Sequence, residues 1–154
     1  MKQDTVVWLT TNPVTTWWIR NVASRLDPLI FRATNGRFFS MGRASMPMLT
    51  LSTTGRRSGR GRSVHLACLE RDGAWLVVAS AMGQEGHPAW SLNLEAEPSC
   101  AVQIEGERFA ARARRLSEAE KGAVWAEVKR TIPQIEVYET RTERDIRLYE
   151  LTRA

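Results

Sequence analysis

A short loop rich in arginine and glycine constrains the fold of this chain more than any other feature. Residues 52–62 read Ser-Thr-Thr-Gly-Arg-Arg-Ser-Gly-Arg-Gly-Arg, between strand-like apolar runs at 47–51 and 64–69. Glycine lets backbone N–H groups converge, and arginine adds permanently charged, bidentate donors. The sequence therefore predicts a hairpin whose connecting loop binds a phosphate or a polycarboxylate group.

Two familiar phosphate loops do not fit this segment. No Gly-Lys-Ser/Thr follows at the spacing of a Walker A loop, and a strand rather than a helix follows the loop, unlike a dinucleotide fingerprint. The alternative that needs no ligand is a solvated basic hairpin.

Length and composition predict one soluble domain with its own core. The chain has 154 residues, of which 43% are hydrophobic and 25% charged. No apolar run approaches the roughly 20 residues that span a bilayer. Residues 1–10 contain no signal-peptide core. We expect a cytoplasmic protein with an N-terminal amphipathic segment, 1–34, before a main domain, 35–154.

The net charge of the chain and its few cysteines and histidines limit the kinds of ligand and partner that it is expected to bind. A net charge of +5 and a pI of about 9.9 suit nucleic acid, anionic membranes or an anionic cofactor. Cys68 and Cys100 lie in strand-like runs and are expected to be buried thiols. With His65 and His87 far apart, no metal site is indicated.

Hydrophobic periodicity predicts the elements. Residues 14–34 form a basic amphipathic helix, which either lies on a membrane surface or packs on its own domain. A helix begins with Pro88 at its first position, and another follows the capping box of Ser117 and Glu120, with Val124, Trp125 and Val128 on its buried side. Strands are expected at 47–53, 63–70, 74–80, 99–105, 107–115 and 146–152. Six short, mostly antiparallel strands with helices on their flanks indicate a small β-barrel.

A second segment, from Ser80 to Trp90, also has a composition suited to a ligand. A strand ends at Ser80, a glycine-containing loop follows, and a helix begins near His87. Free N–H groups at a helix N-terminus favour anions, and Trp90 could cover a planar ring. Alternatively, Trp90 belongs to the core and His87 caps the helix.

Tyr138 and Arg141 form the third constellation. A tyrosine can hydrogen-bond a substrate or donate a proton, although it could also pack beneath the last strand. No Ser/His/Asp or Cys/His arrangement can be assembled, so an enzyme of this sequence would depend on a bound cofactor.

Three motifs resemble those of one known family. They are Leu-Ser-Thr-Thr-Gly-Arg-Arg-Ser-Gly-Arg-Gly-Arg (51–62), His-Pro-Ala-Trp-Ser-Leu-Asn-Leu (87–94) and Glu-Val-Tyr-Glu-Thr-Arg-Thr (136–142). In order and spacing, over residues 35–152, they resemble the deazaflavin-dependent nitroreductases, also called F420H2-dependent quinone reductases, of actinobacteria.

The resemblance implies a split β-barrel of the flavin-reductase, FMN-binding type. It also implies coenzyme F420, a deazaflavin with a phosphate and an oligoglutamate tail, with FMN a weaker alternative. The positions matched to the anionic parts of the cofactor are Thr54, Gly55, Arg56, Arg57, Ser58 and Arg62. Those matched to the ring and its surroundings are Ser80, Ala81, Met82, Gly83, His87, Ala89 and Trp90.

The implied reaction is hydride transfer from the reduced deazaflavin to a quinone, a nitroaromatic or a similar acceptor. Tyr138, Ser80 or solvent would supply a proton. Several family members carry lysine at the position of Ala81 and tyrosines at those of Ile132 and Ile135. These departures spare most of the cofactor contacts but remodel the acceptor side.

Other interpretations remain at this stage. The chain could bind a deazaflavin or flavin with little turnover, or be an FMN enzyme. Nucleic acid is not an expected partner, because the aromatic residues gather in the N-terminal helix and the pocket motif rather than on an open face. Residues 14–34 could hold the protein peripherally on the inner face of the cell membrane, and small split barrels often form homodimers.

Overall fold

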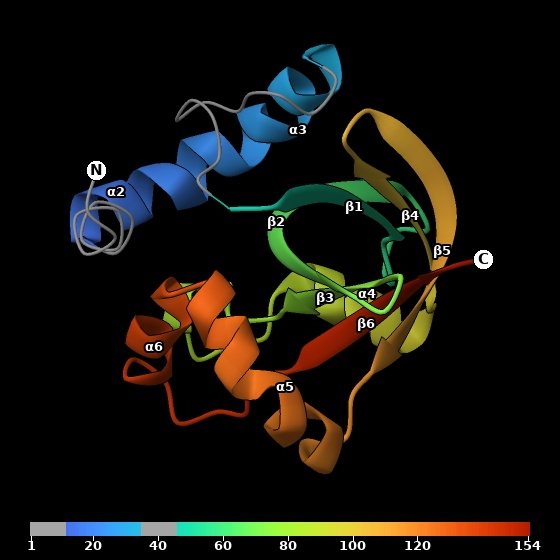
Figure 1. Cartoon of the computed structure of the whole chain (residues 1–154). Helices are drawn as coiled ribbons and strands as arrows, with labels where there is room; N and C mark the ends of the chain where they lie inside the picture. Colours follow the sequence, from blue (N-terminus) through green and yellow to red (C-terminus); the bar gives the residue numbers. More distant parts are fainter. Residues whose placement is uncertain (1–11, 35–45) are drawn as a thin grey trace.

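The protein folds into a closed barrel of six antiparallel strands, and the predicted fold class is confirmed. The computed structural model describes residues 12–34 and 46–154 (Figure 1). The order around the barrel is β1-β2-β3-β6-β5-β4, and β4 closes it against β1. Each strand begins and ends within two residues of its predicted bounds: β1 (Met48–Thr54), β2 (Gly61–Arg71), β3 (Ala74–Val78), β4 (Ser99–Ile104), β5 (Glu107–Arg115) and β6 (Leu148–Arg153).

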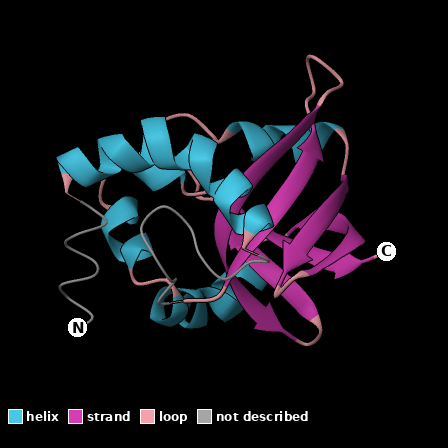
Figure 2. Ribbon diagram, turned by 90° about the horizontal axis from the view of Figure 1, so that it is seen from above, coloured by secondary structure: helices cyan, strands magenta, loops and turns pink. Residues whose placement is uncertain are grey.

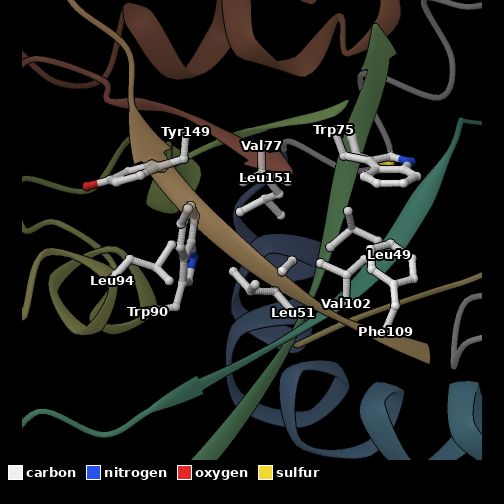
Figure 3. Packing of buried hydrophobic residues seen from close by; sticks show 14 residues of the cluster. Leu49, Leu51, Trp75, Val77, Trp90, Leu94, Val102, Phe109, Tyr149 and Leu151 are labelled. Atoms are coloured by element: carbon white, nitrogen blue, oxygen red, sulfur yellow. The ribbon is translucent and has the colours of Figure 1, made fainter. Parts of the chain in front are cut away.

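Alternation along the strands fills the barrel. In β5 the side chains of Phe109, Ala111 and Ala113 are buried, while the residues between them are exposed. Inside, Trp75 stacks at a tilt on Phe109, with ring centroids 5.0 Å apart, while Trp90 and Tyr149 meet at the other end of the cluster (Figure 3). The ends of the core are therefore closed by aromatic side chains.

A second apolar cluster lies outside the barrel. Helices α5 (Glu118–Thr131) and α6 (Gln134–Glu139) cover buried residues of β3 and β6, including Leu76 and Leu148 (Figure 1). The capping box before α5 is confirmed, since Ser117 N–H donates to Glu120 Oε2 at 2.8 Å and Ser117 Oγ accepts from Glu120 N–H at 3.3 Å. Trp125 was predicted to be buried but is only partly so, because its Nε1 donates to the exposed Glu139 carboxylate at 2.7 Å.

Helix α4 (Ala89–Ala96) begins one residue later than predicted. Pro88 is extended, with φ −63° and ψ 144°, and stands before the first helical residue. Its carbonyl accepts the N–H of Ser91 at 3.1 Å, so the proline begins the helix through its C=O group. A single 3-10 turn, η2 (Ala81–Gly83), lies between β3 and α4.

The N-terminal segment is helical but not one regular helix. It consists of α2 (Pro13–Trp18), the π-helical turn η1 (Ile19–Ala23) and α3 (Ser24–Ala33). The segment lies along one side of the barrel, and α3 contacts β2 (Figures 1 and 2). Ala23 is buried, whereas the apolar side chains of Val14, Trp17, Leu26 and Leu29 are exposed. In the described ranges, no helix is long and apolar enough to cross a membrane. Residues 35–46, whose Gly, Ser and Arg content predicts a connection before the first strand, lie outside these ranges except for Met46.

Candidate cofactor-binding site

A cavity of about 440 Å³ lies between the β1–β2 loop and α4. It brings together two stretches of the chain, 53–64 and 89–93, whose nearest ends are 25 positions apart in sequence. Its lining residues are Thr53, Gly55, Arg56, Arg57, Ser58, Arg62, Ser63, Val64, Ala89, Trp90 and Asn93.

The β1–β2 loop is a tight turn built around Gly55. Gly55 N–H donates to the Arg60 carbonyl at 2.8 Å, and the Gly55 carbonyl accepts from Gly59 N–H at 2.7 Å. A Cβ atom at Gly55 would lie 2.8 Å from Ser58 Oγ and 3.1 Å from the Arg60 carbonyl oxygen. A side chain at residue 55 would therefore crowd this turn, which brings the arginines together.

The arginines of this loop carry uncompensated charge. Arg56, Arg57, Arg60 and Arg62 are exposed, and no carboxylate within residues 12–34 or 46–154 lies within salt-bridge distance of them. Several other arginines are paired with carboxylates, for example Arg153 with Glu107 at 2.7 Å. A cluster of cations at the mouth of a cavity is suited to bind an anion. Arg60 does not line the cavity.

Asn93 joins the two walls of the cavity, and the sequence analysis did not select it. It is only 4% exposed. Its Oδ1 accepts the Arg56 N–H at 3.0 Å, and its Nδ2 donates to Thr53 Oγ1 at 3.1 Å. A signal was available, because Asn93 follows Trp90 by three residues and so lies on the same side of the predicted helix.

The apolar wall is formed by Val64, Ala89 and Trp90. Trp90 is also a core residue, 7% exposed, as the alternative interpretation of the sequence expected. Its ring meets that of Tyr149 edge to face, with centroids 5.6 Å apart and planes at 65° (Figure 3). Tyr149 OH donates to Glu95 Oε1 at 2.6 Å. Burial and then the Glu95 carboxylate raise the pKa of Tyr149 to about 12, so this hydroxyl remains a neutral donor.

The remaining predicted residues do not line this cavity: Thr54, Ser80, Ala81, Met82, Gly83, His87 and Tyr138. Most of them gather at a second location, where the loop before α4 meets α6. A Cβ atom at Gly83 would lie 2.9 Å from the Tyr138 carbonyl oxygen. Tyr138 is buried, and burial raises the pKa of its hydroxyl.

His87 is neutral near pH 7. Partial burial, followed by Arg147 and Arg144, lowers its pKa. Its Nδ1 lies 3.3 Å from Arg144 Nη1, and because a guanidinium can only donate, Nδ1 is the acceptor and the proton resides on Nε2. His87 thus contacts the C-terminal segment and does not cap α4 through its side chain.

Ile132 and Ile135 are 6% and 2% exposed and pack in the outer cluster of α5, α6, β3 and β6. Neither lines the cavity. Burial raises the pKa of Cys68 to about 12 and of Cys100 to about 11, so neither thiol is an effective nucleophile at neutral pH. The described residues contain no cluster of three or more His, Cys, Asp or Glu side chains suited to a metal ion.

A closed six-stranded barrel with a cationic and aromatic cavity at its side defines the class: split-barrel oxidoreductases that bind flavins or deazaflavins. The family model for the F420H(2)-dependent quinone reductases matches residues 23–152. An F420H(2)-dependent quinone reductase of Mycobacterium tuberculosis is 30% identical over 146 residues, covering 91% of this chain and 98% of the relative. A second, putative one from the same organism is 31% identical over 68% of this chain and 87% of the relative.

Solved structures of similar proteins support the same family. An F420-H2-dependent reductase is 32% identical, with a TM-score of 0.62 over 68% of this chain and 93% of its own. A structure described as a domain-swapped dimer is 28% identical, with a TM-score of 0.65 over 88% and 98% of the two chains. The chain belongs to the F420H(2)-dependent quinone reductase family; it is an oxidoreductase, and its cofactor is coenzyme F420.

The cavity fits that cofactor in its chemistry. Arg56, Arg57 and Arg62 offer guanidinium groups for a phosphate and for glutamate carboxylates, and Ser58 adds a hydroxyl. Ala89 and Trp90 offer an apolar wall to a planar ring. The donor set therefore matches both the anionic and the aromatic parts of a deazaflavin.

Proposed function

We propose that this protein reduces a quinone, a nitroaromatic or a similar electrophilic acceptor by hydride transfer from F420H2. The observation that carries the proposal is the cavity that Arg56, Arg57 and Arg62 line together with Ala89 and Trp90. F420H2, when bound, supplies the hydride equivalent. The chain itself binds the cofactor, orients it and excludes water from the reacting atoms.

The β1–β2 loop holds the anionic part of the cofactor in this proposal. The guanidinium groups of Arg56, Arg57 and Arg62 form charge-assisted hydrogen bonds to phosphate and carboxylate oxygens. Asn93 fixes the backbone of Arg56, so the loop is ordered before the ligand arrives. Less conformational entropy is then lost on binding.

Tyr138 and Ser80 are the proposed sources of a proton for the reduced acceptor, with solvent as the third. Because burial raises the pKa of Tyr138, its hydroxyl remains protonated at neutral pH. Ser80 lies two residues after β3 and directly before η2, the turn that contacts α6. If a Tyr138→Phe variant retains cofactor affinity but loses turnover, Tyr138 is supported as the proton donor. Unchanged turnover would exclude Tyr138 and leave Ser80 or solvent as the source of the proton.

The first experiment is a fluorescence titration of the purified protein with oxidised F420 and, separately, with FMN. An Arg56→Ala, Arg57→Ala double variant should bind F420 at least tenfold more weakly, because each lost charge-assisted bond contributes about 1.5–3 kcal/mol. Arg60→Ala is the matched control, since Arg60 belongs to the same loop but does not line the cavity. Equal losses in both variants, or tighter binding of FMN than of F420, would contradict the assignment.

A steady-state assay then tests the acceptor. Oxidation of F420H2 is followed with a soluble naphthoquinone and with a nitroaromatic, and the two kcat/KM values are compared. Turnover with the quinone supports the proposed reaction, and turnover with neither acceptor, despite tight F420 binding, would contradict it.

We further propose peripheral contact with a membrane through residues 14–34. Support comes from the exposed Val14, Trp17, Leu26 and Leu29, which are 78%, 60%, 44% and 63% exposed. Apolar and aromatic side chains on a basic helix favour an anionic bilayer surface. Replacing all four by serine should abolish sedimentation with anionic vesicles and spare F420 binding; unchanged sedimentation would reject the contact.

We also propose that two copies of the chain form a homodimer. It is supported by the similar structure described as a domain-swapped dimer. Light scattering across a range of protein concentrations tests it, and a constant monomer mass up to about 100 μM would exclude any dimer of low-micromolar affinity.

A further inference from the structure

The side chain of Arg144 contacts several residues of the loop that runs from Ser80 to His87. Its Nη2 donates to the Ser80 carbonyl at 2.7 Å and its Nε to the Gln84 carbonyl at 2.9 Å. Nη1 donates to the Asp145 carbonyl at 3.1 Å and contacts His87 Nδ1 at 3.3 Å. One side chain thus reaches three residues that lie about 60 positions earlier in the sequence.

The two carbonyl contacts bracket a strained stretch of backbone. Between Ser80 and Gln84, three successive residues have positive φ: Ala81 at 47°, Met82 at 54° and Gly83 at 75°. For alanine and methionine this conformation costs of order 1 kcal/mol each, and it persists only where the surroundings hold it. Such strain tends to occur at ligand-binding sites.

The opposite side of the loop is also confined. A Cβ atom at Gly83 would lie 2.6 Å from Arg141 Cβ and 2.9 Å from the Tyr138 carbonyl oxygen, so α6 presses directly on the turn. The loop is held between α6 and the Arg144 guanidinium. Packing against α6 confines the position of the loop. The Arg144 guanidinium, in addition, orients the carbonyl groups of Ser80 and Gln84.

The loop leads straight into the cavity wall. After His87, Pro88 begins α4, and Ala89 and Trp90 line the cavity. Any change in the path of residues 80–87 therefore moves the start of α4. Arg144 itself does not line the cavity.

We propose that Arg144 is a positioning residue of the F420 site, which holds the Ser80–His87 loop and, through it, the first turn of α4 in the conformation that binds the cofactor. This inference rests on the proposed function. Lysine cannot replace arginine here, because its ammonium is one point donor, whereas the guanidinium reaches the Ser80 carbonyl, the Gln84 carbonyl and His87 with separate N–H groups in one plane.

The test compares Arg144→Gln and Arg144→Lys with Arg115→Gln. Arg115 is the matched control, because it pairs with Asp145, next to Arg144, at 2.9 Å, while in the part of the chain that the structure describes it donates no hydrogen bond to the loop. Hydrogen exchange of amides 81–87 measures the loop, and F420 titration measures the site. Arg144→Gln should exchange these amides at least tenfold faster than the wild type and bind F420 about tenfold more weakly. Arg144→Lys should recover only part of the exchange protection and part of the affinity. Arg115→Gln should change neither quantity.

Three outcomes would overturn the proposal: unchanged exchange in Arg144→Gln, full recovery by lysine, or equal losses in Arg115→Gln. Added guanidinium ion at millimolar concentration should partly restore F420 affinity to Arg144→Gln but not to the Arg56→Ala, Arg57→Ala variant; restoration in neither also counts against it. If wild type binds no F420, the proposed function fails, whereas the exchange data still decide whether Arg144 holds the loop.

Discussion

At the scale of single residues, two small side-chain features decide the shape of the cofactor cavity. The absence of a side chain at Gly55 lets the arginine loop close, and the amide of Asn93 ties that loop to α4. Arginine supplies the charge, but these two residues determine where the charge is placed. Each can be tested against a matched neighbour.

Gly55→Ala should disturb the loop, whereas Gly61→Ala should not. At position 55 the new Cβ would meet Ser58 Oγ at 2.8 Å and a carbonyl oxygen at 3.1 Å, but at position 61 nothing lies within 4 Å. We expect Gly55→Ala to weaken F420 binding about tenfold, which corresponds to about 1.4 kcal/mol. Fluorescence titration measures this, and similar affinities for the two variants would show that the close approach is unimportant.

Asn93→Ala should lower both stability and affinity. It leaves the Arg56 N–H and the Thr53 hydroxyl without their buried partner, at a cost of about 2–4 kcal/mol in the free energy of unfolding. Thr53→Ala removes only one of the two hydrogen bonds, so its effect on F420 binding should be smaller. Urea denaturation and F420 titration give the two quantities. The role of Asn93 would be refuted by a Thr53→Ala effect on affinity that equals or exceeds that of Asn93→Ala.

At the scale of elements, local pattern predicted the strands well and the N-terminal helix less well. Strand alternation and the Asp72-Gly73 turn, where both residues have positive φ, are local properties. The π-helical turn at residues 19–23 adds a residue to one turn, so the apolar periodicity shifts there. Hydrophobic spacing over 14–34 predicted a single helix, because the spacing alone does not reveal such a shift.

The contact between α3 and β2 should make stability depend on pH. His65 on β2 is largely buried, and burial lowers its pKa to about 4, against a smaller opposing effect of Asp27 on α3. Between pH 6.5 and 4 the unfolded chain binds the proton and the folded chain does not. The free energy of unfolding should therefore fall as pH drops through this window, by at most about 3 kcal/mol.

Urea denaturation at several pH values between 7 and 4 measures this change. His65→Gln removes the titrating group and should flatten the dependence in that window. An equally steep decline in the variant would assign the effect to other groups.

At the scale of the whole molecule, the closed barrel carries the two segments that line the cavity. The β1–β2 loop and the start of α4 meet only because β1 closes against β4 and α4 packs on β1. Binding at their junction should therefore stabilise the entire fold. The reason is that a ligand that binds only the folded state adds its binding free energy to stability.

F420 at 100 times its Kd should add about 2.7 kcal/mol to the free energy of unfolding. For a chain of this length that corresponds to an increase in Tm of roughly 5–10 °C. Differential scanning fluorimetry measures it, with the Arg56→Ala, Arg57→Ala variant as control at the same F420 concentration. An equal shift in that variant would place the ligand elsewhere on the protein.

The sequence by itself determined the strands, the anionic class of the ligand and the family, because alternation, glycine-rich turns and clustered arginines act over a few residues. It also predicted Gly55, Arg56, Arg57, Ser58, Arg62, Ala89 and Trp90, all of which line one cavity. Only the tertiary structure decided that Asn93 ties Arg56 to α4, 37 residues away, and that Arg144 reaches Ser80, 64 residues away. Those contacts depend on strand register and barrel closure, which bring distant segments into hydrogen-bond range and which no local pattern encodes.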